Sequence, residues 1–269
     1  MIIASVANIV DRTEILIEKL DELLNGTILP DFLYVSISEY YPRLKKYYGD
    51  DNIKSLADKL KDYPIKNKLI IYKEDIGPSM KLLTPLKNHT FTDDDYILTF
   101  DDDTGLFKNA IECLTKVSNK YGPNAVYSIM GVKIQGSNLV FVHGEYMEKG
   151  DFYEIDGIGG FRGVLYPYKL IQPNNMISWI NLFIEGFKKY DMIAMHDDHI
   201  FNEYMTLKKI PRLLVDVWPK IKNPDGPGLK INYNPANVSN GIFQDDNTYQ
   251  SLNIFNLILN ENVLSLQVQ

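Results

Sequence analysis

Residues 96–103 read Tyr-Ile-Leu-Thr-Phe-Asp-Asp-Asp, an apolar run that ends in three consecutive aspartates. An apolar, β-prone stretch of about five residues that is bounded by turn chemistry predicts a buried strand. Open α/β sheets bind their ligands in the crevice outside the carboxyl ends of the strands. The aspartate triplet (Asp101, Asp102 and Asp103) is therefore expected at the rim of the fold, where such a sheet binds its ligand.

Three carboxylates this close together raise one another's pKa values and destabilise a fold unless a cation neutralises them. Carboxylate oxygens are hard ligands that suit Mg²⁺ or Mn²⁺, and these ions keep water or substrate phosphate in their other coordination positions. The aspartate triplet therefore predicts a divalent-metal site that holds a phosphorylated ligand. Taken alone, it also fits an acidic turn that faces solvent.

The sequence around this strand alternates between short apolar runs and amphipathic helical patterns. Further strands are expected at residues 2–6, 32–37 and 69–72. Helices are expected between these strands and after residue 110, because apolar residues recur there at helical spacing and Gly or Pro segments end each pattern. This alternation predicts an α/β fold with a mostly parallel central sheet flanked by helices.

The second half of the chain has a less regular pattern. The elements expected there are strands at 125–134, 139–142 and 212–218 and helices at 176–190, 199–207 and 252–259. Residues 223–240 are rich in Pro, Gly and Asn and show no periodicity. A loop of this length inside a compact domain is usually functional or mobile.

The 269-residue chain carries a formal net charge of −7. Nonspecific binding to nucleic acids or anionic membranes needs a basic face, so neither partner is expected. A phosphorylated ligand stays compatible, because a bound metal inverts the local sign of charge. No apolar run approaches the ~18 residues of a membrane-spanning helix, and no signal-type segment opens the chain. Cys113 is the only cysteine, so no intrachain disulfide forms, and a cytoplasmic protein is expected.

A second acidic pair lies in His196-Asp197-Asp198-His199, directly before an apolar-periodic segment. A carboxylate at a helix amino terminus beside a pocket can accept a proton from an attacking hydroxyl group, which is the work of a general base. Asp198, or else Asp197, is the candidate for this role. The alternatives are that one aspartate only caps the helix, or that His196 and His199 bind a metal.

Residues 75–81, Asp-Ile-Gly-Pro-Ser-Met-Lys, follow the third expected strand. Gly77 allows a close backbone approach, the helix start offers free N–H groups, and Lys81 adds a cation. The segment suits the edge of a phosphate or nucleotide site, and an ordinary loop-to-helix turn is the alternative.

A glycine-rich segment at 156–167 places four glycines within seven residues, beside Arg162. Such a loop lets a ligand approach the backbone. The aromatic faces of Phe161, Tyr166 and Trp179 are candidates for stacking on a sugar or a base, with core packing as the alternative for each.

Four motifs occur along the chain in this order: Gly-Pro-x-x-Lys-Leu at 77–82, Asp-Asp-Asp at 101–103, Gly-Gly-x-x-Gly-Val-Leu-Tyr at 159–166 and Asp-Asp at 197–198. In this order they resemble nucleotide-sugar glycosyltransferases of the GT-A fold, in particular family-2-like members with a DxD motif. The resemblance covers about residues 1 to 215.

The resemblance assigns roles to residues by position. Asp101 and Asp103 match the acids of the DxD motif that contact the metal and the ribose, with Asp102 as the alternative to either. Asp198, or failing it Asp197, matches the catalytic acid pair of inverting members. The other donor contacts that the resemblance implies are Ala4, Ser5, Val6, Asn8 and Arg12 around the nucleobase and ribose, Glu39 where the family often has Asp at the base, and Lys81 near the nucleotide.

The function that the resemblance implies is a metal-dependent, inverting glycosyltransferase of the hexosyltransferase type. With Mn²⁺ or Mg²⁺, it would move a sugar from a nucleotide-sugar, best a UDP-sugar, to a hydroxyl group of a glycan, a protein or a lipid-linked acceptor. A single GT-A domain is expected over residues 1–269. Its parts are a donor-binding half at 1–124, an acceptor and catalytic half at 125–222, and a carboxyl-terminal lid loop and helix at 223–269. Many members place a further histidine on the metal, but no His follows His199.

Two functions from other classes stay open. A nucleotidyltransferase shares the sheet and the acidic metal ligands, but it usually has a Gly-rich, basic loop where this chain has Ala-Asn-Ile-Val-Asp-Arg at residues 7–12. A noncatalytic, metal-dependent carbohydrate-binding module would use residues 101–112 as a calcium loop. The acidic residue that closes such a loop would be Glu112, which falls where a helix is already expected.

Overall fold

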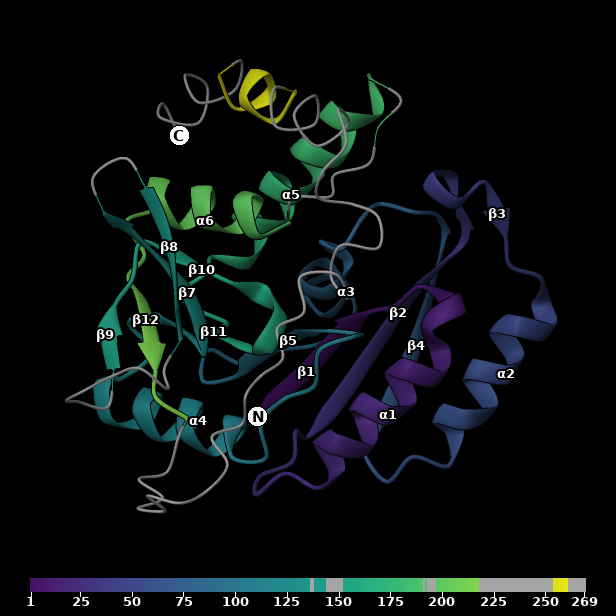
Figure 1. Ribbon diagram of the computed structural model, residues 1–269, viewed down its shortest axis with the longest axis horizontal. Helices are drawn as coiled ribbons and strands as arrows, with labels where there is room; N and C mark the ends of the chain where they lie inside the picture. The colour runs from purple at the N-terminus through teal and green to yellow at the C-terminus, as the bar shows by residue number, and fades with distance from the viewer. Residues whose placement is uncertain (136–137, 144–151, 191, 193–196, 218–253, 261–269) are drawn as a thin grey trace.

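A computed structural model describes residues 1–135, 138–143, 152–190, 192, 197–217 and 254–260 of the chain (Figure 1). The predicted lid segment at 223–240 and His196 lie outside these residues. Among the residues that are described, no helix has the length and apolar character needed to cross a membrane.

The main sheet has nine strands in the order β3-β2-β1-β5-β11-β6-β12-β9, with β4 paired to β2 outside this path. The bounds are Ile2–Ala7 (β1), Phe32–Tyr41 (β2), Lys46–Tyr47 (β3), Asn67–Glu74 (β4), Tyr96–Asp101 (β5), Val126–Ser128 (β6), Phe152–Glu154 (β9), Val164–Pro167 (β11) and Arg212–Val215 (β12). The four strands predicted in the first half pair in parallel, β1 with β2 and β5, and β2 with β4. Strand β11 runs antiparallel to β5 and β6, so the second half of the sheet is mixed.

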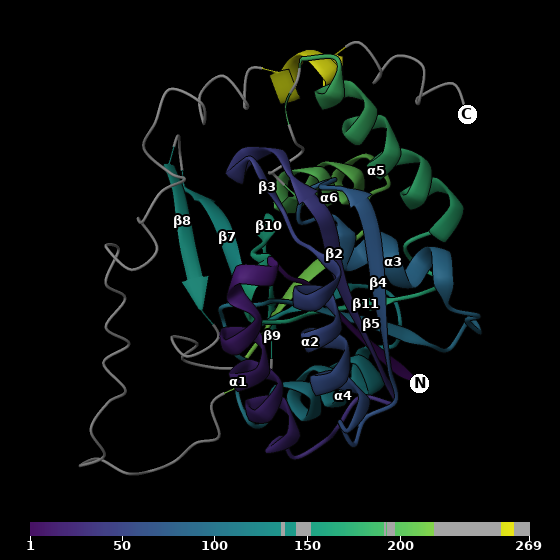
Figure 2. The same ribbon diagram turned by 90° about the vertical axis from the view of Figure 1, so that its right-hand side faces the viewer.

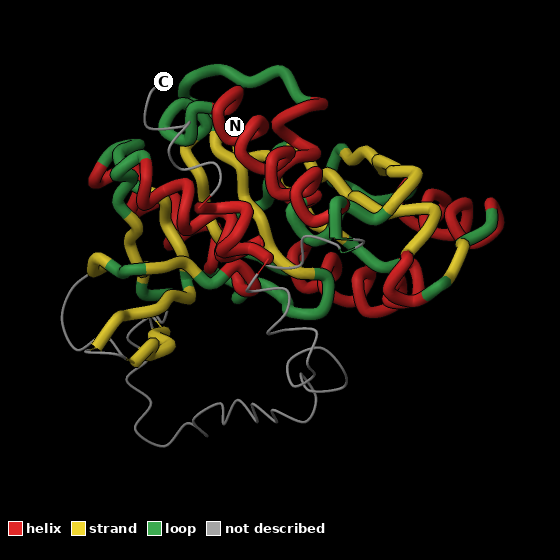
Figure 3. The backbone as a smooth tube through the Cα atoms, turned by 90° about the horizontal axis from the view of Figure 1, so that it is seen from above, coloured by secondary structure: helices red, strands yellow, loops and turns green. Residues whose placement is uncertain are grey.

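Helices cover both faces of this sheet (Figure 3). One face packs against α1 (Thr13–Leu24), α2 (Asp50–Lys61) and α4 (Ala110–Tyr121). The other packs against α3 (Met80–Asn88), α5 (Pro173–Lys188), α6 (Asp197–Leu207) and a helical segment at 254–260. The predicted α/β architecture, a central sheet flanked by helices, is confirmed.

Strand β5 shows how the apolar pattern sets these layers and directs the first aspartate. Successive side chains of a strand point to opposite faces. Leu98 and Phe100 pack in the core beneath α1 and α4, whereas Ile97 packs in the core beneath α3, α5 and α6. Thr99 and Asp101 are two and four residues after Ile97, so their side chains point to the same face of the sheet as that of Ile97. Asp101 is therefore directed to the face that α3 and α6 cover.

A three-stranded antiparallel sheet, formed by β10, β7 and β8, lies to one side of the main sheet (Figure 2). Its bounds are Met130–Gln135 (β7), Asn138–His143 (β8) and Gly157–Ile158 (β10). The single strand predicted over 125–134 is wrong, because the chain bends at Ile129 and divides into β6 and β7. The hydroxyl of Ser128 donates to the Met130 carbonyl at 2.6 Å and accepts the Met130 N–H at 3.3 Å, which holds the bend.

Candidate functional site

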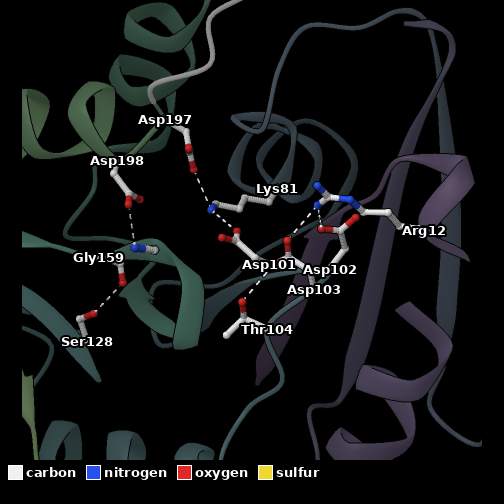
Figure 4. Close-up of polar contacts among 11 residues, drawn as sticks. Arg12, Lys81, Asp101, Asp102, Asp103, Thr104, Ser128, Gly159, Asp197 and Asp198 are labelled. Atoms are coloured by element: carbon white, nitrogen blue, oxygen red, sulfur yellow. Dashed lines mark hydrogen bonds and ion pairs between the residues drawn. The ribbon is translucent and has the colours of Figure 1, made fainter. Parts of the chain in front are cut away.

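The candidate site lies at the carboxyl ends of β1 and β5, beside the first turns of α3 and α6 (Figure 4). Ala7 and Asp101 are register partners at the ends of these two parallel strands. The short 3₁₀ helix η1 (Val10–Arg12) follows β1, and a second one, η4 (Gly160–Arg162), follows β10. A third, η2 (Pro42–Leu44), lies farther along the sheet after β2.

Lys81 is buried between two aspartates that come from different elements. Its Nζ atom lies 2.7 Å from Oδ1 of Asp101 and 2.7 Å from Oδ2 of Asp197. The Lys81 side chain is only 3% exposed, and lysines are almost never fully buried unless they are paired. Burial opposes the charged form, but the carboxylates of Asp101 and Asp197 raise the pKa of Lys81 well above its ordinary value.

Arg12 pairs with the other two aspartates of the triplet. Its Nη1 atom lies 3.1 Å from Oδ1 of Asp102 and 2.9 Å from Oδ2 of Asp103. Asp102 is buried, and burial raises its pKa to about 6 although the Arg12 charge lowers it. The side chains of Asp101 and Asp103 are 34% and 48% exposed. Asp101 and Asp103 therefore present oxygen atoms to solvent, and Asp102 serves mainly to anchor η1.

Asp198 lies in the first turn of α6 and contacts the glycine-rich segment. The backbone N–H of Gly160 donates to Oδ2 of Asp198 at 3.0 Å. The other oxygen, Oδ1, is buried and has no hydrogen-bond partner among the residues described. Burial raises the pKa of Asp198 to about 7; Asp197 raises it as well, and Lys81 opposes both. A carboxyl group that titrates near neutrality and keeps one oxygen free has the properties of a general base.

Asn202 also shapes this site, although no sequence pattern singles it out. The side-chain amide of Asn202 accepts the N–H of Ile158 at 2.8 Å and donates to its carbonyl at 3.0 Å. Asn202 and Asp198 are four residues apart on α6, so they share a helix face and together hold the glycine-rich segment. A Cβ atom on Gly160 would lie 2.3 Å from Oδ1 of Asp198, so the site requires glycine there.

The predicted donor contacts on β1 divide between the two faces of the sheet. Ala4 and Val6 are fully buried in the apolar core, so only their backbones remain for contacts with a ligand. The hydroxyl of Ser5 and the amide of Asn8 are buried without a hydrogen-bond partner in the described part of the chain. Buried polar groups are nearly always bonded, so these two side chains have polar atoms for which the described part of the protein supplies no partner.

The remaining predicted residues lie apart from these contacts or in the core. Glu39 is half-buried near the end of β2, and its carbonyl accepts the Tyr48 N–H at 2.9 Å. Tyr166 and Trp179 are buried in the core, with 0% and 3% exposure, which agrees with the core-packing alternative and not with stacking on a ligand. Both residues fill the space between the sheet and its helices instead of lining an open surface.

The carboxylates at this site fit a cation that takes only part of its coordination from the protein. Five carboxyl groups meet two cationic side chains here, so negative charge is in excess. Within the described ranges, no group of three His, Cys, Asp or Glu side chains is arranged to hold a metal. Asp101 and Asp103 would therefore leave most positions to phosphate and water, as Mg²⁺ commonly does.

Solved structures share this architecture. Staphylococcus aureus TarS 1-349 aligns with a TM-score of 0.55 and 13% identity over 81% of this chain and 58% of that one. The chain has the GT-A fold. TarS 1-349 in complex with UDP also aligns over 81% of this chain and 58% of that one, with a TM-score of 0.54 and 14% identity.

The GT-A likeness is one of structure and not of sequence. No family model matches the chain, and no curated protein matches it by sequence. A mannosyltransferase from Pyrobaculum calidifontis, in complex with GDP-Man and Mn²⁺, aligns with a TM-score of 0.44 and 15% identity over 64% of this chain and 45% of that one. The chain thus spans less than two thirds of these proteins.

Proposed function

We propose that this chain is a glycosyltransferase that moves a sugar from a nucleotide-sugar to an acceptor hydroxyl group with inversion of configuration. The observation that carries the proposal is Asp198, a buried carboxyl group with a pKa of about 7, beside Asp197, which Lys81 joins to Asp101 of the aspartate triplet. Proton acceptance and diphosphate binding are the two tasks that a single displacement at a sugar requires.

The donor diphosphate binds beside Asp101 and Asp103 in this proposal, and its nucleoside lies toward Ser5 and Asn8 at the end of β1. Asp103 together with Asp101 would hold Mn²⁺ or Mg²⁺, and the bound ion would supply positive charge to neutralise the leaving nucleoside diphosphate. The TarS complexes with UDP and with UDP-GlcNAc support a UDP-sugar as the donor. The acceptor is a glycan, a protein or a lipid-linked sugar.

Asp198 acts on the acceptor. Its Oδ1 atom accepts the proton of the acceptor hydroxyl, while the Gly160 N–H holds Oδ2 in place. The hydroxyl oxygen then attacks the anomeric carbon from the face opposite the leaving group, which inverts its configuration. General-base assistance of this kind is worth about 10²- to 10⁴-fold in rate.

We expect a nucleoside diphosphate to stabilise the protein only when a divalent cation is present. A ligand at about 100 times its dissociation constant stabilises the native state by about 2.7 kcal/mol, which a melting curve resolves. The measurement is a thermal-shift screen of UDP, GDP, CDP, ADP and TDP, each with Mn²⁺ and with EDTA. Asp103→Ala removes the effect, and Asp94→Ala, at the opposite end of β5, retains it.

The same screen, extended to Mn²⁺ alone and to the corresponding nucleoside triphosphates, separates the alternatives. Stabilisation by Mn²⁺ alone, with no response to any nucleotide, contradicts the proposal and favours a metal-binding module without transferase activity. A nucleoside triphosphate that stabilises more than every diphosphate favours a nucleotidyltransferase. Retention of the donor's configuration in an isolated product contradicts the single displacement.

A further inference from the structure

Lys81 is not placed to bind a phosphate group, although a nucleotide contact was predicted for it. The side chain is 3% exposed, and its Nζ already lies 2.7 Å from each of two carboxylates. A lysine ammonium group has three N–H donors, so two of them are committed. The charge of Lys81 is thus neutralised by carboxylates of the protein and is not presented to a ligand.

The two partners of Lys81 belong to the two halves of the proposed reaction. Asp101 ends β5 on the donor side, and Asp197 is the neighbour of the proposed base on α6. Lys81 itself lies in the first turn of α3, so a single ammonium group joins three elements. In Figure 4, Lys81 lies between Asp197 and Asp101, and no dashed line joins it to Asp198.

Lys81 also lies close to Asp198 without bonding to it. A Cβ atom built on Gly160 would lie 2.3 Å from Oδ1 of Asp198 and 3.0 Å from Nζ of Lys81, so both atoms flank one backbone position. The charged and titratable groups that act on Asp198 are Asp197 on the same helix, Lys81 on α3, Asp101 on β5 and the hydroxyl of Tyr166 on β11. Among these groups, Lys81 alone is a cation.

We propose that Lys81 is a positioning residue that fixes Asp197 and Asp101 relative to each other and keeps Asp198 available as a base. The inference rests on the proposed function, since it assigns Asp198 to proton acceptance. A buried ion pair that loses one partner leaves an uncompensated buried charge. Without the ammonium group, Asp197 would either take up a proton or move away from Asp101, and the environment of Asp198 would change in both cases.

The test uses three variants of the full chain, Lys81→Met, Asp197→Asn and the double variant. We expect Lys81→Met to move the acidic limb of the kcat/KM profile to higher pH, so that activity falls at least about tenfold at pH 6 and much less at pH 9. Asp197→Asn moves the limb in the opposite direction, because the carboxylate of Asp197 raises the pKa of Asp198. The double variant returns the limb toward the wild-type position and also avoids leaving Asp197 as a buried carboxylate without its cation.

Lys19→Met is the matched control, since Lys19 also lies between two carboxylates, those of Glu18 and Glu22, but away from the site. It leaves the limb in place. The proposal is overturned if Lys81→Met lowers kcat/KM equally at every pH, or if the acidic limb does not move in folded protein. Lys81 would then be a purely structural residue.

A second readout does not depend on sugar transfer. Carboxyl ¹³C NMR titration follows Asp198, assigned by comparison with Asp198→Asn, in the wild-type protein and in Lys81→Met. If the wild type transfers no sugar but the titration of Asp198 moves upward in Lys81→Met, the proposed function fails while the influence of Lys81 on Asp198 stands. An unchanged titration overturns the inference on Lys81 regardless of activity.

Discussion

Asp198→Asn is expected to lower the turnover of sugar transfer by about 10²- to 10⁴-fold, which is the usual contribution of a general base. Asn keeps the shape of the side chain and can still accept the Gly160 N–H, but it cannot take a proton from the acceptor. In the wild type, kcat/KM should fall below about pH 7, where Asp198 becomes protonated. The measurement is the pH dependence of initial rates for wild type, Asp198→Asn and the control Asp94→Asn.

The same substitution should stabilise the fold, and the sign follows from the pKa of Asp198. The folded-state value of about 7 lies above the ordinary value of 3.8, so the folded protein holds the proton more tightly than the unfolded chain. Ionisation of Asp198 therefore costs the wild type stability as pH rises from about 4 to about 7. The melting temperature of Asp198→Asn should exceed that of the wild type by a margin that grows over this interval and then stays constant. If Asp198→Asn lost activity but left the melting temperature unchanged, the result would contradict the buried position of Asp198.

Residues 96–103 illustrate what the sequence can establish. The alternation of Ile97, Leu98, Thr99 and Phe100 predicts a strand with two apolar faces, and parallel strands end at one edge, so the position of the aspartate triplet follows from local pattern alone. The acidic pair at 197–198 was likewise recognisable, because a polar pair directly before an apolar-periodic segment marks a helix start.

The partners of these groups could not be predicted in the same way. Lys81 and Asp197 are far apart in sequence, and their contact depends on how α3 and α6 pack on the sheet. Lys81 therefore had the sequence signature of a phosphate ligand, a cation after a glycine at a helix start. For Tyr166 and Trp179 the sequence could not decide between core packing and ligand stacking, since an aromatic residue in a core strand or helix has the same local pattern as one that lines a site.

Gly160 is the residue at which the smallest change in volume should have the largest effect on function. Its backbone does not adopt a positive φ, so alanine is compatible with the local conformation. A Cβ atom there would lie 2.3 Å from Oδ1 of Asp198, closer than atoms pack. The atom that must move is the end of a side chain and not backbone. The fold should therefore survive Gly160→Ala, while the carboxylate of Asp198 is displaced.

We expect Gly160→Ala to lower turnover on the order of 10²-fold, which is the typical cost of moving a catalytic group by about 1 Å. Stabilisation by the nucleoside diphosphate should persist, because no atom of the aspartate triplet is among the three atoms nearest the added Cβ. The matched control is Gly49→Ala, where an added Cβ meets no atom within 4 Å. The double variant Gly160→Ala/Asp198→Asn should be no slower than Asp198→Asn alone, because a displaced base and an absent base remove the same interaction. Additive losses would show instead that Gly160 acts on the reaction independently of Asp198.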